Sequence, residues 1–164
     1  MKLQLTQDTL DKARELAIKF SELNVSGKEH HIFKTEDNLE KKRIGYIGEL
    51  TFEKYLIENN INYETDEVLY KSDKYDFKIK GKSIDIKTTY WTSYKVTDKV
   101  FLNKEQTERK QIDYYVFAVI HMDKLEILGY LSRFDLDHLS IRTDLQSPAY
   151  EITKENLKKL RDIL

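Results

Sequence analysis

The 164-residue sequence contains no cysteine, a single proline, a single tryptophan and only five glycines. The absence of cysteine excludes disulfides and thiolate-bound metals. The five glycines form no glycine-rich phosphate-binding loop, and the four histidines have no zinc-ligand spacing. Charge of one sign is not in excess either, because 28 Lys and Arg residues and 29 Asp and Glu residues leave a net charge of -1. That balance disfavours nucleic-acid binding by overall charge alone.

Long apolar runs are also missing. No stretch approaches the about 18 apolar residues of a membrane span, so we expect no membrane partner. Residues 1–10, MKLQLTQDTL, lack the apolar segment of a secretion signal, and with the absent cysteine this favours a cytoplasmic protein. What the chain does have is 40% hydrophobic and 12% aromatic residues, over a length that suits one folded domain spanning residues 1–164.

Hydrophobic periodicity predicts helices first and a sheet afterwards. Apolar residues at helical spacing predict helices over residues 6–24 and 39–59, joined by a loop at 25–38. The segments predicted after these are, in chain order, strands at 61–70, 75–79 and 83–88, a short strand or extended lead at 97–103 into a helix at 103–111, strands at 113–120 and 125–131, and a helix at 153–163. The order α-α-β-β-β-α-β-β-α indicates an α/β fold, with a central mixed sheet of about five strands flanked by helices.

The segment YDFKIKGKSIDIKTT predicts a β-hairpin that turns at Lys80–Gly81. This register pairs Phe77 with Ile84 and places Asp76 opposite Asp85. Side chains alternate along a strand, so one face of the hairpin is apolar and the other is charged. The apolar face consists of Phe77, Ile79, Ile84 and Ile86, and the charged face of Asp76, Lys78, Asp85 and Lys87.

Two aspartates that face each other across a hairpin need an explanation. At a Cβ separation of about 5 Å, two carboxylates repel by about 3 kcal/mol at an effective dielectric constant near 20. A protonated carboxyl, salt bridges to Lys78 and Lys87, or a divalent cation could offset this repulsion. The simpler alternative is a solvated polar surface on which neighbouring lysines screen both aspartates.

The second predicted helix contains Gly45 and Gly48 in its middle, where each glycine costs about 1 kcal/mol relative to alanine. Glycine at such positions is typical of a close approach by a neighbouring backbone or side chain. Glu49 follows directly and falls within the apolar arc of the helix. A buried carboxylate needs a cationic partner. That partner is either a lysine at the edge of the core or a metal ion shared with the hairpin aspartates.

These residues resemble the motif of the PD-(D/E)xK nuclease superfamily, which has the restriction-endonuclease-like fold. The matching residues are Glu49 in GELTFEKYL, Asp76 in YDF, and Asp85 and Lys87 in IDIKT. Tyr75 stands where the family name has proline, and this position supplies no metal-binding atom. The order of elements from about residue 40 to 120 also resembles the family core, with the helix at 6–24 and the segment 125–164 as additions.

The resemblance implies a metal-dependent nuclease that hydrolyses DNA, most simply as an endonuclease. Mg²⁺ or Mn²⁺ would bind Asp76, Asp85 and the backbone carbonyl of Ile86, and Glu49 would bind the same ion through water or a second ion. Lys87 would remain a cation beside these carboxylates, orient the water and stabilise the transition state. Small stand-alone nucleases of this type include viral and archaeal ones, for which the compartment would be the host cytoplasm. A homodimer would suit cleavage of both strands.

Other functions stay open at this point. They are a non-catalytic DNA-binding or assembly module on the same fold, a nuclease that acts on RNA, and an unrelated α/β interaction domain with a charged hairpin. Candidate substrate contacts are Lys42, Arg43, Thr88, Tyr90, Gln106 and Gln111. For the basic residues the alternative is a solvated charged surface, and for the aromatic segment TTYWTSY, with Tyr90, Trp91 and Tyr94, it is packing in the core or in a dimer.

Overall fold

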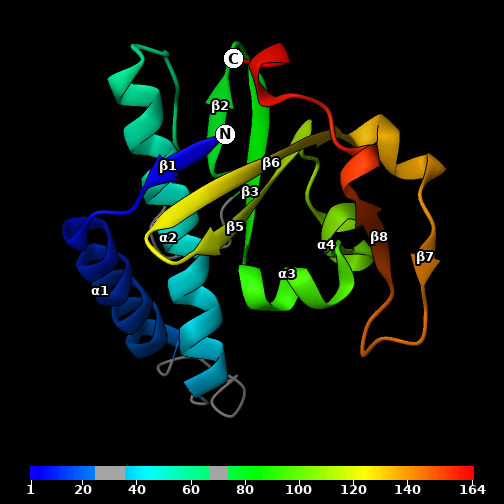
Figure 1. Cartoon of the computed structure of the whole chain (residues 1–164), viewed down its shortest axis with the longest axis horizontal. Coiled ribbons are helices and arrows are strands. Elements are labelled where there is room, and N and C mark those ends of the chain that lie inside the picture. The colour runs from blue at the N-terminus through cyan, green and yellow to red at the C-terminus, as the bar shows by residue number, and fades with distance from the viewer. Residues whose placement is uncertain (25–35, 67–73) are drawn as a thin grey trace.

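Two long helices occupy the first part of the chain. In this computed structural model, which describes residues 1–24, 36–66 and 74–164, strand β1 (Lys2–Gln4) precedes helices α1 (Gln7–Asn24) and α2 (Glu36–Glu58) (Figure 1). The Thr6 hydroxyl accepts a hydrogen bond from the Thr9 N–H at 3.3 Å and so caps α1. Both predicted helices are confirmed. The predicted loop lies outside the described residues as far as residue 35, and residues 36–38 belong to α2. No helix in the described ranges is long and apolar enough to cross a membrane.

The main sheet has five strands in the order β1-β6-β5-β3-β2. The bounds of its further strands are β2 Phe77–Ile79, β3 Lys82–Tyr90, β5 Tyr114–His121 and β6 Lys124–Ser132. Strands β3 and β5 run parallel, and the other neighbours run antiparallel. The structure therefore confirms a mixed α/β fold with a five-stranded mixed sheet.

The predicted hairpin register is confirmed as well. Phe77 pairs with Ile84, and Ile79 pairs with Lys82. The turn residues Lys80 and Gly81 have φ values of 51° and 77°. Positive φ at both turn residues is the type I′ geometry, whose twist matches that of the two flanking strands. The hydrophobic pattern and the turn residues thus specify the same register.

A second, three-stranded sheet has the order β4-β8-β7. Between β3 and β5 the chain forms α3 (Trp91–Thr97), β4 (Lys99–Asn103) and α4 (Lys104–Arg109). After β6 come the 3-10 helix η1 (Arg133–His138), β7 (Ile141–Arg142), β8 (Ala149–Thr153) and the 3-10 turns η2 (Lys154–Asn156) and η3 (Leu160–Asp162). Figure 1 shows α1 and α2 on one side of the five-stranded sheet and the second sheet on the other.

Several predicted elements are wrong. Residues 61–66 form no strand but only a single bridge between Glu64 and Lys78, and the rest of the predicted strand at 61–70 lies outside the described residues. The helix predicted at 153–163 is absent from this described segment. Lys158 instead exchanges backbone hydrogen bonds of 3.0 and 2.9 Å with Tyr130 of β6, which takes the place of helical bonds. The predicted order also lacked β1, α3, β7 and β8.

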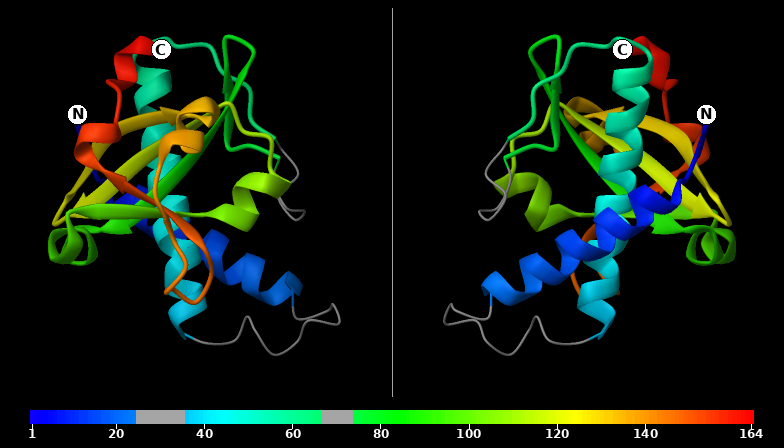
Figure 2. Two further views of the ribbon diagram at one scale, coloured as in Figure 1. Left: turned by 90° about the vertical axis from the view of Figure 1, so that its right-hand side faces the viewer. Right: turned by 90° about the vertical axis from the view of Figure 1, so that its left-hand side faces the viewer.

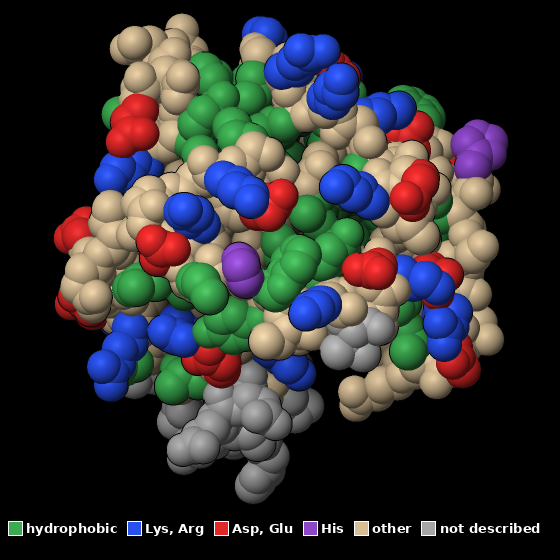
Figure 3. Space-filling view, in the orientation of Figure 1, with side chains coloured by type: hydrophobic (Ala, Val, Ile, Leu, Met, Phe, Trp, Pro, Cys, Tyr) green, Lys and Arg blue, Asp and Glu red, His purple; other side chains and the backbone are tan. Residues whose placement is uncertain are grey.

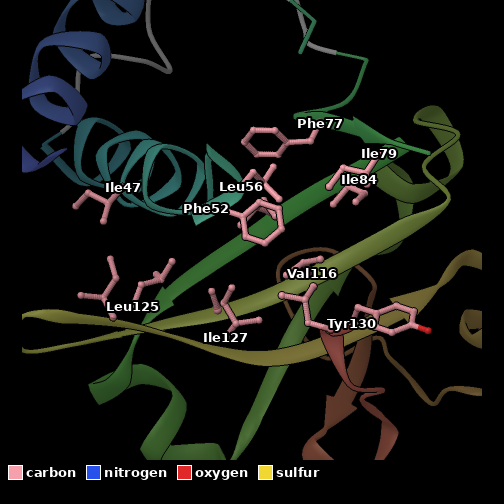
Figure 4. Packing of buried hydrophobic residues seen from close by; sticks show 14 of the residues in the cluster. Ile47, Phe52, Leu56, Phe77, Ile79, Ile84, Val116, Leu125, Ile127 and Tyr130 are labelled. Atoms are coloured by element: carbon pink, nitrogen blue, oxygen red, sulfur yellow. The ribbon is translucent and has the colours of Figure 1, made fainter. Parts of the chain in front are cut away.

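The core has two parts, one on each face of the main sheet. Strand β5 is buried from Tyr115 to Ile120, and its side chains alternate between the two parts. Val116, Ala118 and Ile120 pack with α2, whereas Tyr115, Phe117 and Val119 pack with the second sheet. Figure 4 shows the first part, with the side chains of α2 lying over those of β2, β3, β5 and β6. Figure 2 shows α1 crossing α2 on this side of the sheet.

Candidate active site

The predicted site lies at the edge of β3, beyond the Phe77–Ile84 pair at which the pairing with β2 stops. Strand β2 pairs only with residues 82–84 of β3. Asp76 precedes β2, and its N–H donates to the Ile84 carbonyl at 3.0 Å. Its Oδ2 accepts a hydrogen bond from the Ile86 N–H at 2.6 Å. Because the N–H and C=O of one strand residue point to the same edge, the Ile86 carbonyl also faces this edge.

A cavity of about 510 Å³ opens at this edge, between α2, β3 and α4. Its lining residues are Asn38, Lys41, Lys42, Gly45, Tyr46, Glu49, Asp76, Asp85, Ile86, Lys87, Thr88, Gln106 and Lys110. The structure thus brings together eight of the residues that the sequence indicated, namely Glu49, Asp76, Asp85, Ile86, Lys87, Lys42, Thr88 and Gln106. It does not bring Arg43, Tyr90 or Gln111 into this cavity.

Asp85 is a buried carboxylate between two lysines. Its side chain is only 3% exposed, so the interpretation of a solvated surface aspartate is wrong at this position. Its Oδ2 lies 2.5 Å from Lys87 Nζ, and its Oδ1 lies 3.6 Å from Lys110 Nζ. The contact with Lys87 is an ion pair without good hydrogen-bond geometry, and no other described residue donates a hydrogen bond to this oxygen. A buried oxygen of this kind can accept a further ligand.

Asp76 lines the same cavity as Asp85, and its surroundings disfavour the ionised form of its carboxyl group. Burial raises the pKa of Asp76 well above its usual value, and the charges of Asp85 and Glu49 raise it further. The hydrogen bond from the Ile86 N–H and the charge of Lys87 lower the pKa and offset these effects only in part. A cation placed among the three carboxylates would favour the ionised form of Asp76.

Glu49 reaches the site from α2. Gly45 lies one turn earlier, and a Cβ atom at this position would lie 3.8 Å from Glu49 Oε1. Glu49 is partly buried, and it also lines a second cavity of about 500 Å³ together with Asp76 and Tyr46. Glu49 and Asp76 therefore line both cavities, and each of the two carboxylates borders both of these spaces.

The substitution Asp76→Asn is expected to raise the free energy of unfolding of the metal-free protein at pH 7. Asparagine keeps an acceptor for the Ile86 N–H and removes the repelled charge. A raised folded-state pKa means that the ionised carboxylate costs stability above the ordinary pKa of 3.8 and costs nothing well below it. The gain should therefore shrink as the pH falls toward 4, which urea denaturation in EDTA at both pH values would measure.

Asp113→Asn is the matched control, and its effect on the free energy of unfolding at pH 7 should have the opposite sign. Burial raises the pKa of Asp113, but hydrogen bonds from Ser83 and Lys82 outweigh this and hold the pKa below its usual value. Ionised Asp113 therefore stabilises the fold at pH 7, and its replacement should destabilise the protein. A loss of stability in both variants at pH 7 would contradict the strain at Asp76.

The donor set is suited to a hard divalent cation. It consists of carboxylate oxygens and one strand carbonyl, the ligands that Mg²⁺ and Mn²⁺ prefer. Among the described residues, however, no group of three or more acidic or histidine side chains is close enough to hold a metal ion. The available ligands are thus Asp76, Asp85 and the Ile86 carbonyl, with water in the other positions. Magnesium usually keeps several waters and binds one or two carboxylates, so these residues fit it.

The other predicted substrate contacts lie in different surroundings. Arg43 donates to Glu40 at 2.7 and 2.8 Å and to the Tyr90 hydroxyl at 2.8 Å, and Tyr90 donates to Glu40 at 2.6 Å. This network ties α2 to the end of β3. Lys42 lines the cavity with its Nζ 4.0 Å from the centre of the Phe20 ring. Gln111 is exposed outside the cavity.

The aromatic segment TTYWTSY contributes to the core through Tyr94. Tyr94 is buried, with its ring centre 5.5 Å from that of Trp91, which in turn lies 5.2 Å from His121. Core packing is therefore confirmed for Tyr94. On the face shown in Figure 3, Lys and Arg side chains are interspersed with Asp and Glu, and apolar side chains lie between them. Both signs of charge therefore occur on this visible face.

Sequence reasoning missed Lys110 and Tyr115. Lys110 lies four residues after Gln106, so the helical spacing that indicated Gln106 could also have indicated Lys110. Tyr115 lies beside Asp85 in the parallel pair β3–β5, and its buried hydroxyl has no hydrogen-bond partner among the described residues. Burial and the charge of Asp85 raise the pKa of Tyr115 to about 12. Only the parallel pairing could have placed it next to Asp85.

Comparison of the chain with protein-family models, with curated proteins and with solved structures gave no match.

Proposed function

We propose that this chain is a divalent-metal-dependent endonuclease that hydrolyses DNA, with a restriction-endonuclease-like core of the PD-(D/E)xK type. One observation carries the proposal. Glu49, Asp76, Asp85 and Lys87, which come from α2 and from the two arms of the hairpin, line one cavity at the edge of β3. In this proposal the protein acts in the cytoplasm, and a homodimer would cut both strands of a duplex.

The metal ligands would be Asp76, Asp85 and the carbonyl of Ile86, with Glu49 beside them. When bound, a divalent ion would acidify a water molecule and neutralise charge on the phosphoryl oxygens. Burial and the charges of Asp85 and Glu49 raise the pKa of Asp76, so a bound cation would favour the ionised form of this carboxylate. The Ile86 N–H fixes the orientation of the Asp76 carboxylate through its 2.6 Å hydrogen bond.

Lys87 would act on the substrate side of the same site. Its side chain is 25% exposed and its ammonium group lies against the buried Asp85, so it can donate to a phosphate oxygen or to the attacking water. In the reaction, the water oxygen forms a bond to phosphorus while the bond to the leaving oxygen breaks. Lys87 would stabilise the negative charge that develops on the phosphoryl group.

The test is incubation of the purified protein with supercoiled, linear, single-stranded and branched DNA and with RNA. Each substrate is tested with Mg²⁺, with Mn²⁺ and with EDTA, and the products are separated on gels. We expect cleavage of DNA that requires the ion and is lost in Asp85→Asn. Asp137→Asn is the matched control, because Asp137 is exposed on η1 and outside the cavity.

The outcomes separate the proposed function from its alternatives. Cleavage of RNA in place of DNA would show that the protein is a nuclease acting on RNA. Binding of DNA without cleavage under any of these conditions would indicate a non-catalytic module. Cleavage in EDTA, or full activity in Asp85→Asn, would contradict the proposed site.

A further inference from the structure

We propose that Lys110 is a substrate-positioning residue that contacts Asp85 in the metal-free protein and turns to a DNA phosphate when a cation binds Asp85. This inference rests on the proposed function and assigns a role to a residue outside the motif. Its basis is the arrangement of two lysines on the two oxygens of one buried carboxylate.

Lys110 comes to Asp85 from a separate element. It is the C-cap residue of α4, where its N–H donates to the Gln106 carbonyl at 3.0 Å. Its Nζ lies 3.6 Å from Asp85 Oδ1, while Lys87 Nζ lies 2.5 Å from Oδ2. The side chain of Lys110 is 22% exposed and that of Asp85 is 3% exposed. One buried carboxylate is therefore neutralised by two ammonium groups.

A divalent ion at Asp85 would compete with these two lysines. The distance of 3.6 Å to Lys110 exceeds that of a charge-assisted hydrogen bond, about 2.7–2.9 Å, whereas Lys87 is in direct contact. Lys87 also lies on β3 itself, which fixes its position relative to Asp85. Repulsion by the ion would therefore displace Lys110 first.

The displaced side chain of Lys110 can bind a DNA phosphate within the same cavity. Lys41 and Lys42 line the cavity from α2, and Lys110 lines it from α4. A phosphate held between the two helices would meet lysines from both sides. The long, flexible side chain of lysine allows this movement while the backbone of α4 stays in place. Lys110 would thus strengthen the binding of DNA and weaken the binding of the metal ion.

The first measurement is titration calorimetry of Mg²⁺ and Mn²⁺ into Lys110→Ala without DNA. Removal of the competing cation should tighten ion binding about tenfold, a size typical of coupled sites. Lys104→Ala is the matched control, because Lys104 lies on the same helix, pairs with Glu108 at 3.5 Å and does not line the cavity. This control should bind the ion as the wild type does.

The second measurement is binding and cleavage of DNA at a saturating concentration of the ion. Lys110→Ala should raise KM with little change in kcat, and should lower by about 1 the slope of log affinity against log salt concentration. Lys110→Arg retains the cation and should restore DNA affinity.

The results distinguish a role of Lys110 in positioning the substrate from a purely structural role of this residue. Unchanged or weaker ion binding in Lys110→Ala, while the wild type binds the ion and cuts DNA, would overturn the role of Lys110 alone. A wild type that neither binds the ion nor cuts DNA would overturn the proposed function together with this inference. A lower thermal stability with unchanged ion and DNA affinity would show a purely structural role and would also overturn the inference.

Discussion

Lys87→Ala is expected to lower the rate of DNA cleavage by the proposed nuclease about 1,000-fold. Of the two lysines that pair with Asp85, Lys87 is the nearer, with its Nζ at 2.5 Å against 3.6 Å for Lys110. Loss of one charged donor that acts mainly in the transition state lowers kcat and changes KM little. Single-turnover rates at saturating DNA and Mg²⁺ would measure the effect on the chemical step.

Two further measurements separate this role from a structural one. Ion binding should persist in Lys87→Ala, because lysine is not a metal ligand and Asp76, Asp85 and the Ile86 carbonyl remain in place. Lys104→Ala, on α4 and outside the cavity, should cleave DNA as the wild type does. A cleavage rate for Lys87→Ala near that of the wild type would mean that another cation, such as Lys110, stabilises the transition state.

Gly48→Ala is expected to destabilise the fold by about 2 kcal/mol, although alanine favours a helix. A Cβ atom at this position would lie 1.9 Å from Thr88 Oγ1, 3.0 Å from Thr88 Cβ and 3.4 Å from Ile86 Cγ2. The added methyl group would force α2 away from β3, which also carries Asp85 and Lys87. The loss of stability, measured by urea denaturation, should therefore be accompanied by loss of cleavage.

Gly45→Ala provides the matched control, since both glycines lie in the same helix. A Cβ atom at Gly45 would be no closer than 3.8 Å to its nearest neighbour, an ordinary contact with Glu49 Oε1. This variant should be neutral or more stable by up to about 1 kcal/mol. Thr88→Ala should restore much of the stability of Gly48→Ala in the double variant. Equal stability of the two glycine variants would contradict the close approach at Gly48.

The parts that could be predicted from the sequence depend on local patterns. The hairpin register follows from four apolar residues on one face and from Lys80–Gly81, which adopts the positive φ values of the turn. The convergence of Asp76, Asp85 and Lys87 follows from the same alternation. The glycines of the second helix correctly indicated a close approach, although only the structure assigns it to Gly48.

The remaining parts depend on contacts between distant segments. Alternation predicted that Asp85 lies opposite the isoleucines, but it could not show that α4 and the second sheet cover that face. Strand β7 has two residues and β8 has five, which is too short for a periodic signal. The helix predicted at 153–163 failed because backbone pairing of Lys158 with Tyr130 replaces helical hydrogen bonds.

The pairing of β4 with β8 has a consequence for the growing chain during translation. The Lys104 N–H at the start of α4 donates to the Pro148 carbonyl at 3.0 Å, and Asn103 pairs with Ala149. The wall that carries Gln106 and Lys110 therefore rests on residues synthesised well after the hairpin. A ribosome-bound chain that stops before Ala149 contains the whole motif but lacks this support. The wall of the cavity can therefore be complete only after β8 has been synthesised.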